Sequence, residues 1–129
     1  MKIIFIDSSS IILDTLQMLM KNFSDSFDTS FYQNPADIVN MIELGSLEFD
    51  ILFSEIIFKN LDGINLIKRV KESKKFKEKR VAIITKEYNK ERLNTLNSFG
   101  VNDIFTKSIY SDHLEIFLSD VIAREIKVI

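Results

Sequence analysis

The length, composition and charge of this chain indicate one folded domain and exclude several kinds of function. Its 129 residues are 46% hydrophobic and 11% aromatic, which is enough to form one substantial core. The formal net charge of −2 gives no general attraction to nucleic acid or to an anionic membrane, and the absence of cysteine excludes disulfides, thiolate zinc sites and thiol nucleophiles. No apolar stretch approaches the roughly 20 residues of a membrane span. We therefore expect a single cytoplasmic domain over residues 1–129, without a membrane partner.

Four elements are predicted in the first half of the chain. The continuous β-branched run 2-KIIFI-6 is typical of a strand covered on both faces. From Ser10 to Asn22 apolar residues recur every three or four positions, which predicts a helix that the serines in front can cap. The alternating segment 26–33 predicts a second strand. The segment 34-NPADIVNMIELG-45 predicts a second helix, with asparagine as the cap, proline at the first helical position and glycine at the end.

The second half repeats this alternation three times. Strands are predicted at 49–54, 80–85 and 102–106, and helices from Gly63 to about Lys74, over 88–98 and from 110 to about 126. Connections of this length between strands imply right-handed crossovers. The chain is therefore expected to form five β/α units, with a parallel five-stranded sheet between layers of helices, which is a doubly wound three-layer α/β/α fold.

Polar side chains that can do chemistry follow the predicted strands. In an open parallel sheet the site lies at the carboxyl ends of the strands, near the point where the strand order switches. Those positions hold Asp7, Ser8, Glu55, Thr85 and Lys107. Carboxylates, hydroxyls and an amine from distant parts of the chain are therefore predicted to meet at one edge of the sheet.

In the order and spacing of these segments, the chain resembles the receiver domain of two-component response regulators, a CheY-like, flavodoxin-type fold. The matching stretches are 3-IIFIDS-8, 50-DILFSEIIFKNLDG-63, 81-VAIIT-85 and 100-GVNDIFTKS-108. The resemblance covers essentially the whole chain and implies phosphorelay signal transduction through protein contacts, without enzymatic activity. In that family an aspartate accepts the phosphoryl group and an acidic pair holds Mg²⁺ with it. A Thr or Ser and a Lys contact the phosphoryl group, and an aromatic residue of the fifth strand reports the switch.

Carried over to this sequence, the family pattern is kept only in part. Thr85 and Lys107 are kept, but Glu55 stands at the acceptor position, and Lys59 and Ser108 replace prolines of the pattern. Glutamate moves its carboxylate by up to roughly 1.5 Å relative to aspartate, and a misplacement of about 1 Å can cost on the order of 100-fold in rate. We therefore expect Glu55 to be a poor acceptor, which leaves weak phosphorylation of Glu55 open as an alternative.

The metal position is altered as well. The resemblance places it at Asp7, Glu55 and Ile57, but Ser8 replaces the second acid of the turn. Mg²⁺ prefers near-octahedral oxygen coordination and uses one or two carboxylates. We therefore expect no cofactor, with Mg²⁺ binding weak or absent, and in its absence an ion pair between Glu55 and Lys107.

These departures suggest a pseudo-receiver, which keeps the fold and the contact surface of the family but is not switched by aspartyl phosphorylation. Either Glu55 imitates the phosphorylated state, or the domain is fixed in one state that partners recognise. The switch position is Ile104, and an aliphatic side chain cannot perform the rotation of an aromatic ring. This substitution favours the second interpretation.

Other interpretations of the same sequence have less support. Asp62 precedes the helix predicted from Gly63, so we expect it to be an N-cap rather than an alternative acceptor. His113 has no histidine partner for a phosphorelay or a metal and is expected on the surface. A flavodoxin-like small-molecule or nucleotide-binding module would need a phosphate-binding turn. The turn 7-DSSS-10 is the only candidate, and its aspartate would repel phosphate.

The expected partners are proteins, either a sensor kinase or a downstream output protein. The resemblance places the output face on the fourth helix, fifth strand and fifth helix, and leaves a homodimer through this face open. The face would draw on Tyr88, Lys90, Arg92, Phe105, Tyr110 and Lys127. A nucleic-acid partner is not expected, because the basic run 68-KRVKESKKFKEKR-80 is interleaved with Glu72 and Glu78.

Overall fold

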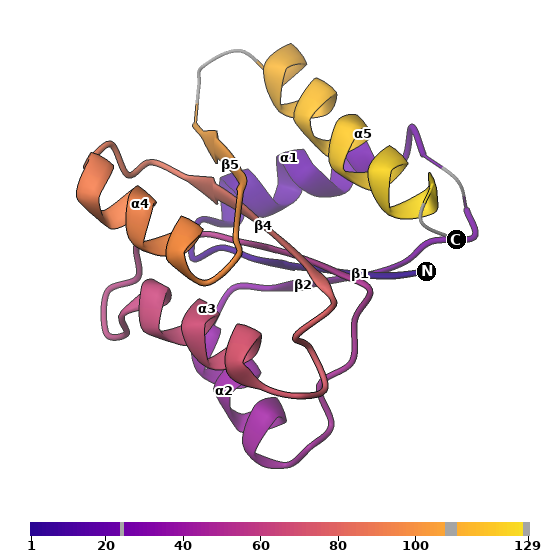
Figure 1. The fold of residues 1–129 in the computed structure, drawn as a ribbon. Helices are drawn as coiled ribbons and strands as arrows, with labels where there is room; N and C mark the ends of the chain where they lie inside the picture. The colour runs from indigo at the N-terminus through magenta and orange to yellow at the C-terminus, as the bar shows by residue number, and fades with distance from the viewer. Residues whose placement is uncertain (24, 108–110, 128–129) are drawn as a thin grey trace.

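The computed structural model describes residues 1–23, 25–107 and 111–127, and over these residues strands and helices alternate along the chain (Figure 1). The elements are β1 (Lys2–Ile6), α1 (Ser10–Met20), β2 (Asp28–Tyr32), α2 (Pro35–Glu43), β3 (Ile51–Ser54), α3 (Gly63–Glu72), β4 (Arg80–Thr85), α4 (Lys90–Ser98), β5 (Asp103–Thr106) and α5 (Ser111–Lys127). The predicted order of elements is confirmed, and the boundaries differ by a residue or two. Ser108 and Tyr110, singled out in the sequence, lie outside the described residues.

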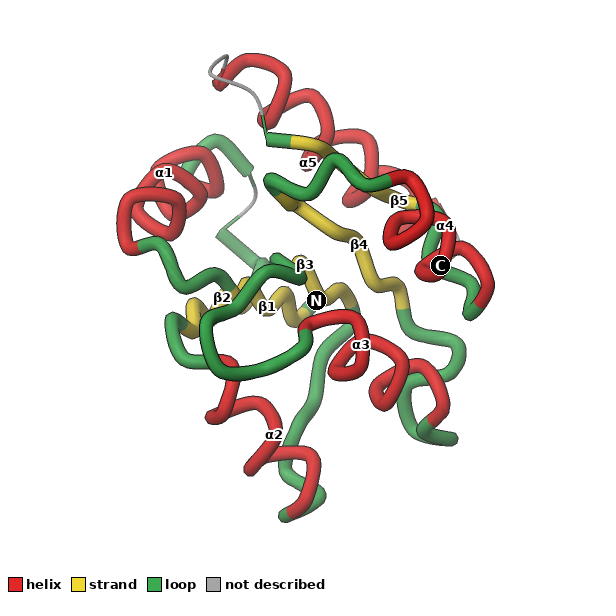
Figure 2. Tube along the Cα trace, turned by 90° about the vertical axis from the view of Figure 1, so that its left-hand side faces the viewer, coloured by secondary structure: helices red, strands yellow, loops and turns green. Residues whose placement is uncertain are grey.

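The strands form one parallel sheet in the order β2-β1-β3-β4-β5. The chain starts in the middle of the sheet, moves outward to β2 and then returns past β1 to β3, so the switch in strand order lies between β1 and β3. Helices α1 and α5 cover one face of the sheet, and α2, α3 and α4 cover the other (Figures 1 and 2). This is the doubly wound three-layer fold that the sequence predicts.

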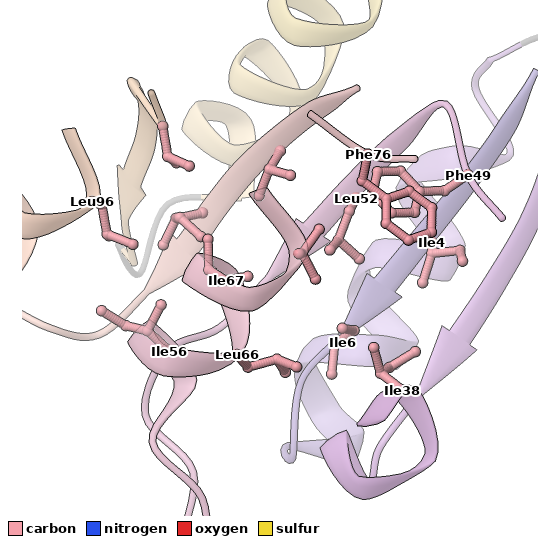
Figure 3. Packing of buried hydrophobic residues seen from close by; sticks show 14 of the residues in the cluster. Ile4, Ile6, Ile38, Phe49, Leu52, Ile56, Leu66, Ile67, Phe76 and Leu96 are labelled. Carbon is pink, nitrogen blue, oxygen red and sulfur yellow. The ribbon is translucent and has the colours of Figure 1, made fainter. Parts of the chain in front are cut away.

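Each central strand contributes to two hydrophobic cores, because successive residues of a strand point to opposite faces of the sheet. On β1, Ile4 and Ile6 pack toward α2, α3 and α4 (Figure 3), whereas Ile3 and Phe5 pack toward α1 and α5. All four side chains are almost completely buried. Apolar packing on both faces therefore fixes the strands in register and aligns their carboxyl ends.

The loop between β3 and α3 folds back closely on the end of β3. Asp62 caps α3 by accepting a hydrogen bond from the Ile64 N–H at 3.0 Å, as expected from the sequence. Gly63 donates its N–H to the Ile56 carbonyl at 3.2 Å, and a Cβ at position 63 would lie only 2.3 Å from that oxygen. Only glycine permits this approach, which brings the start of the loop close to Glu55.

Candidate functional site

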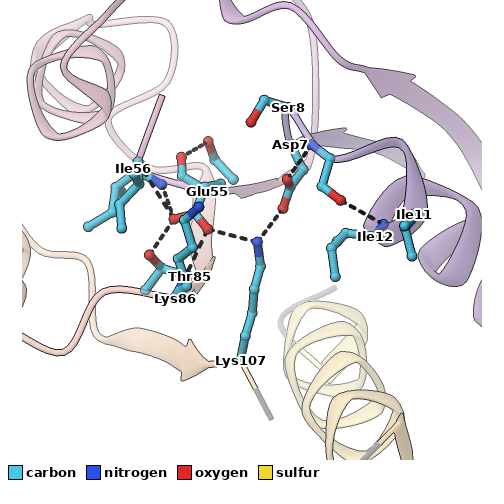
Figure 4. A network of polar contacts seen from close by, with 12 residues as sticks. Asp7, Ser8, Ile11, Ile12, Glu55, Ile56, Thr85, Lys86 and Lys107 are labelled. Carbon is cyan, nitrogen blue, oxygen red and sulfur yellow. Dashed lines mark hydrogen bonds and ion pairs between the residues drawn. The ribbon is translucent and has the colours of Figure 1, made fainter. Parts of the chain in front are cut away.

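Asp7, Glu55, Thr85 and Lys107 meet at the carboxyl edge of the sheet (Figure 4). The backbone hydrogen bonds of the sheet continue one residue past the strands, because the Glu55 N–H donates to the Ile6 carbonyl at 3.0 Å. At the other side the Lys107 N–H donates to the Thr85 carbonyl at 2.7 Å. The side chains that the sequence placed at strand ends are thus brought together by the parallel register itself.

One oxygen of the Glu55 carboxylate is held by its own loop and by β4. Glu55 Oε1 accepts hydrogen bonds from the backbone N–H groups of Ile56 at 2.7 Å and Ile57 at 3.1 Å, and also from the Thr85 hydroxyl. The Thr85 oxygen accepts in turn from the Glu87 N–H at 3.0 Å. The hydroxyl proton of Thr85 is therefore directed at Glu55.

The other oxygen of Glu55 faces two further donors. Glu55 Oε2 accepts from the Lys86 N–H at 3.2 Å and from the Lys107 ammonium at 2.8 Å, which is the ion pair expected from the sequence. The same ammonium lies 2.8 Å from Asp7 Oδ2. Asp7 Oδ1 accepts from the Ser9 N–H at 2.9 Å. Lys107 thus joins two carboxylates that come from different strands.

The site is buried, and its ion pairs keep it charged. Glu55 and Asp7 are 2% and 3% exposed, and Thr85 is fully buried. Burial by itself raises the pKa of Glu55, but the hydrogen bonds from Lys107, Thr85 and the backbone outweigh it and hold that pKa below its ordinary value. Burial by itself lowers the pKa of Lys107, but the hydrogen bonds and ion pairs with Asp7 and Glu55 outweigh it, so the pKa of Lys107 lies above its ordinary value. Glu55 is therefore a carboxylate and Lys107 an ammonium at neutral pH.

These residues do not fit Mg²⁺, whose oxygen ligands lie at about 2.0–2.1 Å. The Lys107 ammonium already contacts both carboxylates, and the Ile57 N–H points at Glu55. Ser8, the remaining position of the acidic turn, is exposed. Among the described residues, no three His, Cys, Asp or Glu side chains are grouped closely enough to hold a metal ion.

Ile104 and Phe105, two neighbouring residues of β5 singled out in the sequence, pack on opposite faces of the sheet. Ile104 packs against the core on the α2–α3–α4 side, while Phe105 faces the opposite core and meets Phe117 at 5.4 Å between ring centroids. Phe105 is therefore less available to a partner than the sequence suggested, because it packs inward. Tyr88 and Lys90 are exposed.

Two of the alternative sites find no support in the geometry. The turn that starts at Asp7 uses its Ser9 N–H for the Asp7 carboxylate, and the Ser9 hydroxyl caps α1, so these groups are not directed at a phosphate. Most cations of the basic run 68–80 pair with acids: Lys68 with Glu72, Arg69 with Glu43, Lys75 with Glu48, Lys79 with Asp50, and Arg80 with Asp103 and Glu125. His113 is exposed on α5, as expected.

The sequence did not reveal the backbone donors at this site. The N–H groups of Ile56, Ile57 and Lys86 all point at Glu55, but a backbone N–H is present at every such position and leaves no trace in residue type. Arg92, which was expected on a contact surface, is exposed and also donates to the Glu87 carboxylate and lies 3.8 Å from Asp62, two contacts that the sequence did not reveal. The spacing of Glu87 and Arg92, an acid followed by an arginine in the first turn of the next helix, could have predicted this ion pair.

Comparison with known proteins gives a consistent result. A family model of the response regulator receiver domain matches residues 3–118. The Mn²⁺-bound form of response regulator Rcp1 is 14% identical, with a TM-score of 0.82 over 93% of this chain and 90% of that one. The chemotaxis response regulator CheY4 of Vibrio cholerae is 16% identical, with a TM-score of 0.76 over 93% and 97%. A signal receiver domain from Clostridium thermocellum is also 16% identical, with a TM-score of 0.80 over 93% and 95%.

These structural likenesses show the fold, while the match to the family model extends over most of the chain. Comparison with curated protein sequences gives no significant match. Over the residues that the structure describes, no helix combines the length and apolar character needed to cross a membrane.

Proposed function

Because this chain belongs to the response regulator receiver family, we propose that it acts in two-component signalling as a receiver held in one state by Glu55, not switched by phosphorylation of an aspartate. Receiver domains generally act through contacts with kinases and output proteins and are not enzymes. Here the groups that the family resemblance assigns to the phosphoryl group, Thr85 and Lys107, are engaged by the Glu55 carboxylate.

The observation that supports this proposal is the number of donors around Glu55. Its two oxygens accept five hydrogen bonds, three from backbone N–H groups, one from Thr85 and one from Lys107. An ionised carboxylate has about four lone-pair sites. Every lone-pair site is therefore engaged by a donor that an attack on phosphorus would have to displace, and the side chain is only 1% exposed to an incoming phosphodonor.

The surroundings of Glu55 lack a second requirement for phosphoryl transfer. That reaction depends on in-line positioning and on cations that neutralise the phosphoryl oxygens. Lys107 is already paired with Asp7 and Glu55, so its charge is balanced within the resting protein. A fixed state is also consistent with Ile104, an aliphatic side chain packed against one core.

In this proposal the output is a protein contact that does not depend on phosphorylation. The exposed parts of the face formed by α4, β5 and α5 include Tyr88, which is 73% exposed, and Lys90. A sensor kinase or an output protein would recognise this surface. Self-association through the same face is the competing use of these residues.

The test is incubation with acetyl phosphate and Mg²⁺, followed by measurement of intact mass. We expect no adduct on the wild-type protein. The matched control is the double variant Ser8→Asp, Glu55→Asp, which restores the family residues and is expected to gain one phosphoryl group. A single stable adduct on wild-type Glu55 would contradict the proposal and support a weakly phosphorylated receiver.

A further inference from the structure

Two buried carboxylates at the sheet edge require a counter-charge. Asp7 and Glu55 are 3% and 2% exposed, and their side chains come from neighbouring strands. Burying like charges together is unfavourable unless a nearby group of opposite charge compensates them. In the ranges that the structure describes, Lys107 is the cation that forms ion pairs with both.

The Lys107 ammonium lies between these carboxylates (Figure 4). Its Nζ is 2.8 Å from Asp7 Oδ2 and 2.8 Å from Glu55 Oε2, and the lysine side chain is 18% exposed. A divalent cation that bridged the same two oxygens would lie against the ammonium at close range. The two cations would compete for the same ligands and repel each other, so only one of them can occupy this position.

The remaining oxygens of the two carboxylates are also engaged. Asp7 Oδ1 accepts from the Ser9 N–H, and Glu55 Oε1 accepts from two backbone N–H groups and Thr85. Lys107 is the one partner in this set that carries a charge. Removing its charge would leave two buried carboxylates uncompensated, each with an oxygen facing the position of the former ammonium.

We infer that Lys107 is a permanent internal cation that takes the place of a bound metal between Asp7 and Glu55, and that loss of its charge creates a divalent-cation site. This inference deepens the proposed function and rests on it in one respect: a receiver held in one state by its own side chains needs no dissociable cation. The ligands of the created site are the oxygens of Asp7 and Glu55, completed by water.

The test is a titration with Mn²⁺ in which free Mn²⁺ is measured by electron paramagnetic resonance. Wild type and Lys107→Arg, which keep the charge, are expected to show no saturable binding at millimolar Mn²⁺. Lys107→Met and Lys107→Gln have side chains of similar length without a charge. We expect them to bind Mn²⁺ at least about tenfold tighter than wild type, because the repulsion of one unit charge at roughly 4 Å is removed. Adding Asp7→Asn to either variant should abolish the gain.

The control for a general effect of losing a lysine is Lys79→Met, since Lys79 pairs with the half-exposed Asp50 at 3.3 Å. This variant should not gain Mn²⁺ binding. Circular dichroism establishes whether each variant is folded. If Lys107→Met does not fold, Lys107→Gln is the uncharged variant that is compared with wild type. Saturable binding by wild type as tight as by the uncharged variants would overturn the inference, as would a folded uncharged variant without a gain.

This experiment can fail independently of the proposed function. It contains no phosphodonor, so its outcome does not depend on whether Glu55 accepts a phosphoryl group. Conversely, an adduct on Glu55 in the mass measurement would contradict the proposed function, while the difference in Mn²⁺ affinity between wild type and the uncharged Lys107 variants would still be measured separately.

Discussion

At position 55 a single methylene group determines which atoms the carboxylate can reach. Glutamate extends about 1.5 Å further than aspartate. The Glu55 carboxylate thereby contacts Thr85 and Lys86 at the end of β4 and Lys107 beyond β5, in addition to its own loop. Glu55 is thus the common acceptor of hydrogen bonds from three separate segments of the chain.

Replacing Glu55 by glutamine should therefore be strongly destabilising. The amide keeps the shape but places an NH₂ group where N–H, hydroxyl or ammonium donors already point, and it leaves Lys107 less compensated. We expect Glu55→Gln to lower the free energy of unfolding by about 3 kcal/mol, as is typical when one partner of a buried ion pair is removed. Urea denaturation at neutral pH measures the loss.

The same chemical change at an exposed acid is the control. Glu43 pairs with Arg69 at 3.6 Å, and its side chain is 58% exposed. Glu43→Gln should cost less than about 1 kcal/mol, because exposed ion pairs contribute little. If Glu55→Gln and Glu43→Gln lowered the free energy of unfolding equally, the buried contacts of Glu55 would contribute no more to stability than an exposed ion pair.

The difference in unfolding free energy between wild type and Glu55→Gln depends on pH, and the direction of the pKa shift of Glu55 determines how. The pKa of Glu55 lies below its ordinary value of 4.5, so its ionised form stabilises the fold above that pH. This contribution is lost as the pH falls from 4.5 through the lower pKa of the folded state. The gap in unfolding free energy between wild type and Glu55→Gln should therefore be largest near neutral pH and shrink under acid.

Among the elements, the loop between β4 and α4 determines how Thr85 and Lys86 face Glu55. Within this loop the Glu87 N–H donates to the Thr85 hydroxyl oxygen at 3.0 Å, and the Glu87 carboxylate accepts from Arg92 in the first turn of α4. Arg92 also lies 3.8 Å from Asp62, the N-cap of α3. One arginine thus connects two loops that border the site.

Loss of Arg92 should increase local opening of the loop between β4 and α4, with little effect on the stability of the whole protein. We expect Arg92→Gln to increase amide hydrogen exchange several-fold at Lys86 and Glu87, since exchange reports local opening. The free energy of unfolding should change by less than about 1 kcal/mol, because Arg92 is 43% exposed.

Arg124 provides a matched control for this variant. Its side chain is equally exposed, at 43%, and it pairs with Asp103 at the start of β5 and with Asp120 of α5. Arg124→Gln should leave exchange at Lys86 and Glu87 unchanged. If both variants accelerated exchange there to the same degree, Arg92 would have no specific role in holding the loop.

Across the whole molecule, the edge that carries the site rests on a row of aromatic rings. Phe31, Phe5 and Phe53 stack across β2, β1 and β3 with centroid distances of 4.9 and 5.0 Å, and Phe117 of α5 meets Phe53 at 6.4 Å. Phe53 lies in β3, two residues before Glu55, which directly follows the strand. Close packing of rings in contact resists small displacements, so the row opposes movement of the end of β3, which carries Glu55.

Much of this architecture could be predicted because its signals are periodic. Continuous apolar runs marked the central strands, and the carboxyl ends of the strands in the predicted parallel sheet then located Asp7, Glu55, Thr85 and Lys107. The inward direction of Phe105 could not be predicted, because a one-residue change of register exchanges the two faces of a four-residue strand.

The backbone donors to Glu55 were equally hidden, since they depend on the path of two loops and not on side-chain identity. The sequence predicted the ion pair of Glu55 with Lys107, but it did not reveal that Lys107 also pairs with Asp7. That second contact requires the three strand ends to be placed in space. Local patterns therefore located the site, and the tertiary arrangement determined how its charges are balanced.

The most direct test is a crystal structure of the protein grown with Mg²⁺ and beryllium fluoride, an analogue of the phosphoryl group. A receiver held in one state by Glu55 should show Lys107 Nζ about 2.8 Å from both Asp7 Oδ2 and Glu55 Oε2, as here, with no beryllium fluoride on Glu55. A six-coordinate cation between Asp7 and Glu55, with Lys107 displaced and beryllium fluoride attached to Glu55, would contradict it.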